Sequence, residues 1–270
     1  MAQETAKIDT PIVFEDVYMR FDENEVLRGV SFELKHGETK VMLGIAGSGK
    51  STVLKLAMGL LKPDQGRITV LGEDVSAMNE YDLFALRRRI GMVFQEGALF
   101  DSMRVKDNVA YRMQEEKVAE DEIQTRVVDA LTFVELAHTL ERFPSELSGG
   151  MRRRVAIARA IVNKPEVILY DSPTGGLDPI TSTRIIELVV KQRDVYRTSA
   201  LLVTHRLQDA FTMVTHYFDV QQNKMVPCPD SETVDTHTSF LLLKDGKVIF
   251  DGTGPELGTS KDEYIREYIA

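Results

Sequence analysis

The chain has 270 residues, of which 43% are hydrophobic and 28% charged, as in an ordinary globular protein rather than a disordered one. Its formal net charge of −9 argues against a general nucleic-acid-binding protein. No run reaches the roughly 18 apolar residues needed to cross a bilayer, residues 1–9 lack the apolar core of a secretory signal, and one cysteine excludes an internal disulfide. We therefore expect a cytoplasmic protein that needs a partner to reach a membrane.

The first part of the chain predicts strands that lead into a glycine-rich turn. Its apolar patterns and turn residues indicate short strands at 12–21, 26–34 and 38–43 and around Gly66 and Gly72. A helix is expected from about Lys50 to Leu61, ended by Lys62-Pro63, because proline cannot continue a helix. A mostly helical, charged stretch follows over residues 101–146.

The second part alternates helices and apolar strands. A helix is predicted over 149–163, capped by Ser148, and a second over about 182–196. The apolar runs 167–170 and 200–203 on either side of the second helix predict buried parallel strands. A hairpin over 240–250 and a tail helix from Lys261 complete the chain. This alternation predicts an α/β fold around a mostly parallel sheet.

The turn after the third strand has the spacing of a phosphate-binding loop. Residues 44–51, GIAGSGKS, match G-x-x-x-x-G-K-[ST] in full. Glycines let backbone N–H groups point at phosphate oxygens, and the following helix N-terminus adds positive potential. Lys50 is expected on the β- and γ-phosphates and the Ser51 hydroxyl on Mg²⁺. The residues assigned to ATP here are Gly44, Gly47, Ser48, Gly49, Lys50, Ser51 and Thr52.

An acidic residue that could hold the metal lies at the end of a later strand. Asp171 follows the apolar run 167–170, at the carboxyl end of a predicted parallel strand. Ligand sites of open α/β sheets lie at that edge. Asp171 and Ser51 therefore predict a Mg²⁺ site beside the phosphate-binding loop.

Residues 147–154, LSGGMRRR, give the chain its resemblance to the ABC transporter ATPases, whose signature is L-S-G-G-Q. The other motifs of that family occur in the expected order along the chain, and the resemblance covers about residues 12–252. By this resemblance, Phe21 is the aromatic residue that stacks on adenine, and Gln95 is the glutamine that contacts Mg²⁺ and the attacking water. Asp178 belongs to the loop that crosses to the opposite subunit, and His205 is the histidine that senses the γ-phosphate.

The same resemblance implies the architecture and a dimer. The expected fold is a P-loop NTPase (RecA-like) core with an antiparallel β subdomain and an inserted α-helical subdomain. The implied parts are 12–94 and 158–252 (core with β subdomain), 95–157 (helical subdomain), 219–238 (inserted loop) and 257–270 (helical tail). In this family Ser148, Gly149 and Gly150 face the ATP held by another subunit, so a head-to-tail dimer around two ATP molecules is expected.

One position departs from the family pattern in a way that concerns catalysis. The family places a glutamate after the metal-binding aspartate, whereas this chain has Ser172. A serine hydroxyl has no useful basicity near pH 7, and general-base catalysis contributes roughly 10²–10⁴-fold. Three interpretations stay open: slow hydrolysis with His205 and Gln95 placing the water, pairing with a different glutamate-bearing subunit, or a deliberately introduced substitution.

Two further features resemble the Mla/MCE-type lipid-transport ATPases. Met151 replaces the usual glutamine of the signature, and residues 95–103 with 107–110 have the pattern of that group. The resemblance implies a permease in the inner membrane as partner, with a small regulatory subunit and an MCE-type lipid-binding protein as further candidates. Ala98, Leu99 and Phe100 are a candidate docking patch for the permease; the alternative is that Leu99 and Phe100 anchor the helical part.

Two alternatives belong to other functional classes. A non-hydrolytic ATP-binding switch remains open because of Ser172, and so does an ATPase of another ABC importer class. The arginine runs 87–89 and 152–154 could suggest nucleic-acid contact, but in an acidic chain we interpret them as surface or phosphate-facing charges.

Overall fold

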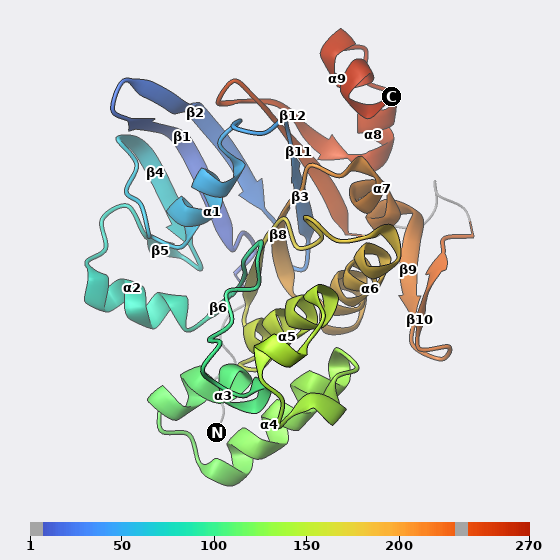
Figure 1. The fold of residues 1–270 in the computed structure, drawn as a ribbon. Coiled ribbons are helices and arrows are strands. Elements are labelled where there is room, and N and C mark those ends of the chain that lie inside the picture. The colour runs from blue at the N-terminus through green and yellow to red at the C-terminus, as the bar shows by residue number, and fades with distance from the viewer. Residues whose placement is uncertain (1–7, 230–236) are drawn as a thin grey trace.

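The computed structural model describes residues 8–229 and 237–270, which form three sheets with helices packed around them (Figure 1). The strands are β1 (Ile12–Phe21), β2 (Asn24–Leu34), β3 (Thr39–Leu43), β4 (Gln65–Val70), β5 (Glu73–Asp74), β6 (Ile90–Val93), β7 (Val167–Asp171), β8 (Ser199–Val203), β9 (His216–Asp219), β10 (Lys224–Pro227), β11 (Thr238–Lys244) and β12 (Lys247–Thr253).

The helices alternate with these strands along most of the chain. They are α1 (Lys50–Ala57), α2 (Glu80–Arg87), α3 (Val105–Glu115), α4 (Glu120–Phe133), α5 (Gly149–Ile161), α6 (Pro179–Tyr196), α7 (Leu207–Thr215), α8 (Gly254–Gly258) and α9 (Glu263–Ile269), with 3-10 turns η1 (Ala137–Thr139) and η2 (Pro144–Glu146).

The central sheet has six strands in the order β12-β11-β3-β8-β7-β6. Five of them run parallel, and only β12, the hairpin partner of β11, is antiparallel. All five residues of β3 are buried, as expected for a strand covered on both faces. The predicted α/β architecture with a mostly parallel sheet is confirmed.

Alternating side chains divide the core between the two faces of this sheet. In β7, Ile168 and Tyr170 pack into the cluster formed with the helices α3 to α6, whereas Val167 and Leu169 pack into the cluster that includes α1 and the strands β1, β2 and β4. This division follows from the two-residue period of a strand. Strand β3, after which the phosphate-binding loop begins, is likewise held by packing on both faces.

A four-stranded antiparallel sheet, in the order β2-β1-β4-β5, lies at the upper left in Figure 1. The predicted hairpin β11–β12 also forms, and it turns at Asp245 and Gly246, whose φ angles are 49° and 75°. Positive φ at both central residues is the requirement of a type I′ turn, which an Asp-Gly pair meets easily.

The helices α3 and α4 form the lower part of the molecule in Figure 1, and α5 packs against both. The predicted helical stretch over 101–146 is confirmed, with η1 and η2 after α4. Helix α5 is continuous across the expected limit at 157/158, so this limit does not coincide with the end of an element. The limits of the parts stay a prediction.

The end of α1 was predicted wrongly. The helix stops at Ala57, four residues before the expected end, because Gly59 adopts a φ of 63°. The N–H of Gly59 donates to Leu56 O at 2.9 Å and that of Leu60 to Lys55 O at 2.9 Å. This is the Schellman pattern, so a left-handed glycine ends the helix before Pro63 is reached.

The bounds of two other helices also differ from the expectation. Helix α6 begins at Pro179 rather than near 182, because Asp178 caps it and proline suits the first helical position. Helix α5 ends at Ile161, two residues early.

The expected insertion and tail acquire their own elements. Within the expected insertion at 219–238, β10 pairs with β9 as a hairpin, while residues 230–236 lie outside the described residues. A short helix α8, which was not expected, overlaps the start of the tail, and α9 begins at Glu263, two residues after the expected Lys261. In the described part of the chain, no helix has the length and apolarity needed to span a membrane.

Candidate nucleotide-binding site

The loop between β3 and α1 requires glycine at two positions. Gly44 has a φ of 147°, and a Cβ there would lie 2.4 Å from Leu243 O. Gly49 caps α1 with a φ of 99°, and its Cβ would lie 2.7 Å from Leu27 Cδ2. Any larger residue would push the loop away from the sheet, so both glycines are needed for its path.

Lys50, the first residue of α1, turns its side chain back into the loop. Its Nζ donates to Gly44 O at 2.8 Å, to Ile45 O at 2.6 Å and to Ser48 Oγ at 3.1 Å. Burial lowers the pKa of Lys50, and the negative charge of Asp171 partly restores it. The ammonium therefore lies in the concave side of the loop, held by weakly attractive neutral oxygens that a phosphate could replace.

Two oxygen ligands meet beside this lysine. Ser51 Oγ donates to Asp171 Oδ1 at 3.2 Å, which joins the start of α1 to the end of β7. A hydroxyl and a carboxylate are the oxygen donors that Mg²⁺ prefers. Two protein oxygens leave the other coordination positions of Mg²⁺ to water and phosphate, as is usual for this ion at phosphate sites.

A cavity of about 550 Å³ opens over the loop and brings together residues from five parts of the chain. Its walls come from the phosphate-binding loop, from the ends of β6, β7 and β8, and from β2. The lining residues are Val26, Ala46, Gly47, Gly49, Lys50, Ser51, Thr52, Gln95, Ser172, Val203 and His205. Most of the residues predicted for ATP, water and γ-phosphate therefore share one cavity.

Phe21 lies at the end of β1, where it pairs with Asn24. Its side chain is 44% exposed and does not line the main cavity. Asn24 lines an adjoining hollow of about 390 Å³, which also shares Ala46 and Gly47 of the loop. Phe21 is thus an exposed aromatic near this hollow rather than a core residue of its sheet.

Ser172 occupies a constrained position directly after Asp171. Its φ is 45°, its N–H donates to Val203 O at 2.9 Å, and its carbonyl accepts from Gly175 N at 2.9 Å. The residue is 8% exposed and lines the cavity. The position directly after Asp171 therefore lines this cavity, and here it carries a hydroxyl.

The signature residues lie apart from this cavity. Ser148 caps α5 by accepting a hydrogen bond from Met151 N at 3.2 Å, and Ser148 and Gly149 are exposed. Gly150 is buried, and a Cβ there would lie 2.3 Å from Thr181 Cγ2 on α6. The start of α5 is therefore an exposed helix N-terminus that lies outside the cavity of its own chain.

Asp178 caps α6, whose Thr181 lies beside Gly150 of the signature. It accepts from Thr181 N at 3.0 Å, and this bonding to Thr181 lowers the pKa of its carboxyl. It does not line the nucleotide cavity of its own chain. Asp178 is exposed, as are Ser148 and Gly149 of the signature.

Arg153, which we expected to be a surface or phosphate-facing charge, is instead buried and joins two loops of the site. Its Nη1 donates to Phe94 O at 3.0 Å and its Nη2 to Gly175 O at 3.2 Å, and burial lowers its pKa. Phe94 precedes Gln95, and Gly175 N bonds to Ser172. The arginine therefore holds the α5 helix to both loops that carry candidate catalytic residues.

A buried polar network next to Ser172 was also not predicted from the sequence. Thr174 Oγ1 donates to Asp209 Oδ2, and Arg206 Nε lies 3.5 Å from the same carboxylate oxygen. Arg206 also donates to Ser182 Oγ at 2.8 Å. The network ties the segment after His205 to α6, and no local pattern in the sequence marks it.

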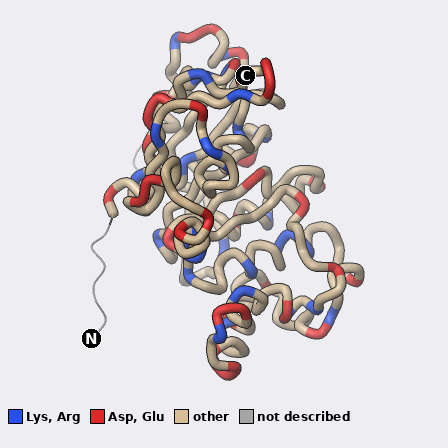
Figure 2. The backbone as a smooth tube through the Cα atoms, turned by 90° about the vertical axis from the view of Figure 1, so that its left-hand side faces the viewer, with Lys and Arg blue, Asp and Glu red and all other residues tan. Residues whose placement is uncertain are grey.

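The remaining arginines of the two runs are held by the protein itself. Arg87 pairs with Glu80, Arg89 with Glu166 at 2.6 Å, and Arg154 donates to Val134 O at 2.9 Å. Figure 2 shows Lys and Arg interspersed with Asp and Glu along the backbone. These contacts support a structural role rather than a basic surface for nucleic acid.

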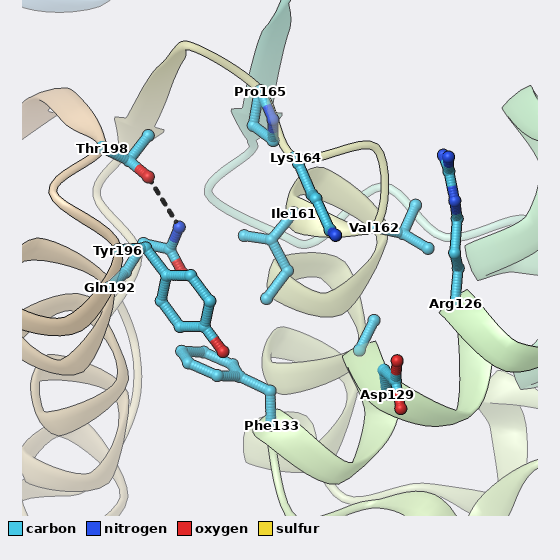
Figure 3. Close-up of a pocket in the computed structure, with 11 residues that line it drawn as sticks. Arg126, Asp129, Phe133, Ile161, Val162, Lys164, Pro165, Gln192, Tyr196 and Thr198 are labelled. Atoms are coloured by element: carbon cyan, nitrogen blue, oxygen red, sulfur yellow. Dashed lines mark hydrogen bonds between the residues drawn. The ribbon is translucent and has the colours of Figure 1, made fainter. Parts of the chain in front are cut away.

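A second cavity, of about 410 Å³, lies between α4, the end of α5 and the end of α6 (Figure 3). Phe133 and Tyr196 form an edge-to-face pair on one side of it, with centroids 5.7 Å apart. Gln192 donates to Thr198 at 2.9 Å nearby. None of the predicted nucleotide residues lines it.

The comparisons with known proteins agree with this geometry. Residues 27–175 match the ABC transporter family. The chain is 38% identical over 270 residues to the protein TRIGALACTOSYLDIACYLGLYCEROL 3, chloroplastic, of Arabidopsis thaliana, covering 96% of this chain and 73% of that protein. It is 38% identical over 194 residues to the probable ribonucleotide transport ATP-binding protein mkl of Mycobacterium leprae (strain TN), covering 72% of this chain and 56% of that protein. It thus spans about half the length of that mycobacterial relative.

A solved structure is similar over most of the fold. The dimeric structure of a post-hydrolysis state of the ATP-binding cassette MJ0796, bound to ADP and Pi, has a TM-score of 0.73 and 27% identity, covering 90% of this chain and 98% of that chain. The expected P-loop NTPase fold is confirmed by this similarity. The chain belongs to the ABC transporter family and is an ABC-type ATPase.

Proposed function

We propose that the chain binds Mg-ATP in the cavity over the phosphate-binding loop and closes head to tail on a second copy. The observation that carries this proposal is the separation of two half-sites on one chain. Lys50 and Ser51 line the cavity, whereas Ser148 and Gly149 form an exposed helix N-terminus outside it. A helix N-terminus attracts phosphate oxygens, so the signature of one copy would complete the site of the other.

Mg²⁺ would be held by Ser51 and Asp171, whose oxygens already lie 3.2 Å apart. Gln95 lines the same cavity and supplies an amide oxygen that could reach the metal or a water. When bound, the ion would neutralise phosphate charge. Lys50 would move its ammonium from the carbonyls of Gly44 and Ile45 to the β- and γ-phosphates.

Hydrolysis by this chain would be slow in the absence of a carboxylate base. Ser172 cannot accept a proton from water near pH 7, and His205 and Gln95, which also line the cavity, would orient the water. In a homodimer both sites would carry Ser172, so neither site would compensate for the other. A partner subunit with glutamate at this position would restore one or both sites.

The work of the ATPase would be coupled to a membrane permease that moves phospholipids or other lipids, as in Mla/MCE systems. The name of the Arabidopsis relative refers to a glycolipid and supports this substrate class. The mycobacterial relative is named for ribonucleotide transport, which is the second candidate. A small regulatory subunit and an MCE-type lipid-binding protein would complete such an assembly.

The permease would dock beside Gln95. Phe100 is 42% exposed and packs on Tyr111, with ring centroids 4.8 Å apart, whereas Leu99 packs into the core. Of the three expected patch residues, Ala98 and Phe100 are thus available to a partner, and Leu99 anchors the segment. Arg159 fixes this segment by donating to Ala98 O and Gly97 O, each at 2.8 Å.

Steady-state ATPase activity of the complex reconstituted with its permease tests the catalytic part of the proposal. We expect slow but measurable hydrolysis, and an increase of roughly 10²–10⁴-fold in Ser172→Glu, because the variant regains a general base in the cavity. Ser172→Ala is the matched control, and Lys50→Ala should abolish activity. Wild-type activity equal to that without enzyme, with recovery in Ser172→Glu, would refute a slow motor and favour a switch that only binds ATP.

Transport by the same complex in lipid vesicles distinguishes the substrate classes. We expect ATP-dependent movement of a labelled phospholipid and none of a labelled ribonucleotide. Movement of the ribonucleotide alone would refute the lipid assignment while leaving the ATPase assignment intact.

A further inference from the structure

The C-terminal helix α9 is seated on the core of its own chain. Asp262 caps it by accepting from Ile265 N at 3.0 Å, and Ile265 is 2% exposed. Tyr264, Tyr268 and Ile269 pack against the same core cluster. The short helix therefore has a defined place, although only seven residues form it.

The place of α9 is the edge of the sheet where the phosphate-binding loop begins. Lys244, at the end of β11, holds its Nζ 3.7 Å from the centroid of the Tyr264 ring. Its neighbour Leu243 provides the carbonyl against which Gly44 is packed. Because β11 and β3 are parallel neighbours, the tail and the loop meet at the same end of the sheet.

The contact with the loop is made by one hydroxyl. Gly44 N donates to Tyr268 Oη at 3.0 Å, across 224 residues of sequence. The carbonyl of Gly44 accepts from Lys50 Nζ at 2.8 Å. One residue thus connects the tail, through its N–H, with the phosphate-binding lysine, through its C=O.

Gly44 is buried and closely surrounded. A Cβ added to it would lie 2.4 Å from Leu243 O and 2.7 Å from Ser48 Oγ. A buried N–H without a partner is unfavourable, so the loop would shift toward conformations that hydrate it. Burial also raises the pKa of Tyr268, which keeps the hydroxyl protonated near neutral pH.

We propose that Tyr268 is a positioning residue for ATP binding, which holds the first peptide of the phosphate-binding loop and thereby the resting place of Lys50. The inference rests on the proposed nucleotide site and adds the tail to it. It makes ATP affinity depend on whether α9 is docked. A partner that bound α9 elsewhere would weaken nucleotide binding without touching the cavity.

The test compares two variants that each remove one phenolic oxygen from the full chain. Tyr268→Phe removes the acceptor of Gly44 N, whereas Tyr264→Phe removes a buried hydroxyl that has no hydrogen-bond partner among the described residues. Titration calorimetry with Mg-ATP should give about 3–10-fold weaker binding for Tyr268→Phe, the loss of one hydrogen bond, and a change under about twofold for Tyr264→Phe.

Two further measurements separate positioning from general stability. The melting temperature without nucleotide should be lower in Tyr268→Phe than in Tyr264→Phe by no more than roughly 2–4 °C, because both variants keep the packed ring and one hydrogen bond contributes about 1 kcal/mol. Amide hydrogen exchange at Gly44 should be slow in the wild type and faster in Tyr268→Phe. Equal ATP affinity of Tyr268→Phe and wild type, or a lower melting temperature with intact affinity, would overturn the inference. Absence of ATP binding by the wild type would instead refute the proposed function.

Discussion

Replacing Arg153 by methionine tests whether one buried guanidinium joins the two loops of the site. The substitution keeps the aliphatic stem of the side chain but removes the donors to Phe94 O and Gly175 O. Hydrogen bonds from charged groups contribute more than neutral ones, and the carbonyls left behind would need new partners. The arginine is 7% exposed, so water can only partly replace it.

The expected loss of stability is roughly 2–4 kcal/mol, because two charge-assisted bonds are partly offset by the cost of burying the charge. The lowered pKa of Arg153 reflects that burial. For a chain of this size, a loss of about 3 kcal/mol corresponds to a melting temperature lower by roughly 6–12 °C. The variant should also bind Mg-ATP more weakly, because Gln95 and Ser172 lie in the two loops that the arginine holds.

Thermal denaturation followed by far-UV circular dichroism measures this effect, since the chain has no tryptophan for fluorescence. Arg152→Met is the matched control, because the neighbouring arginine makes one bond, to Leu147 O at 2.8 Å, within its own segment. A melting temperature of Arg153→Met no lower than that of Arg152→Met would contradict the bridging role.

Three further predictions concern the two half-sites. Phe21→Ala should weaken ATP binding by about 1–3 kcal/mol in calorimetry, the range of base stacking, with little change in apo stability; unchanged affinity would exclude stacking. Gly150→Ala should destabilise by about 1–3 kcal/mol in urea unfolding through its clash with Thr181 Cγ2, and adding Thr181→Ser should restore much of the loss. Hydrogen bonding lowers the pKa of Asp178 in the folded protein. The ionised cap therefore stabilises α6 fully at pH values above the pKa of aspartate in the unfolded chain, and this stabilisation is lost as the pH falls through the pKa of Asp178 in the folded protein. The stability gap between wild type and Asp178→Ala should therefore shrink in acid, and a constant gap would refute the charged cap.

The sequence by itself determined those features whose physical cause lies within a few residues. The phosphate-binding loop follows from glycines at fixed spacing between a buried strand and a helix, and the cap of α5 follows from Ser148 directly before Gly149. The hairpin turn at Asp245-Gly246 has the same local origin. The order of motifs was also sufficient to indicate the ABC family, which the comparisons confirm.

Some local signals were present but were outweighed by others. Pro63 was expected to end α1, yet Gly59 already ends it, because a left-handed glycine completes the hydrogen bonds of the last turn. Asp178-Pro179 is a helix start that the expected onset near 182 overlooked. These errors concern helix ends, where neighbouring breakers compete.

Only the tertiary structure decided which distant groups serve the loop. Arg153 appeared in a run of three arginines, and nothing in that run distinguishes the one that turns inward to Phe94 and Gly175. The contact of Tyr268 with Gly44 depends on β11 pairing with β3, which brings the end of the chain to the beginning of the loop. Hydrogen bonds between remote segments depend on how the chain packs rather than on neighbouring residues, so no local sequence pattern predicts them.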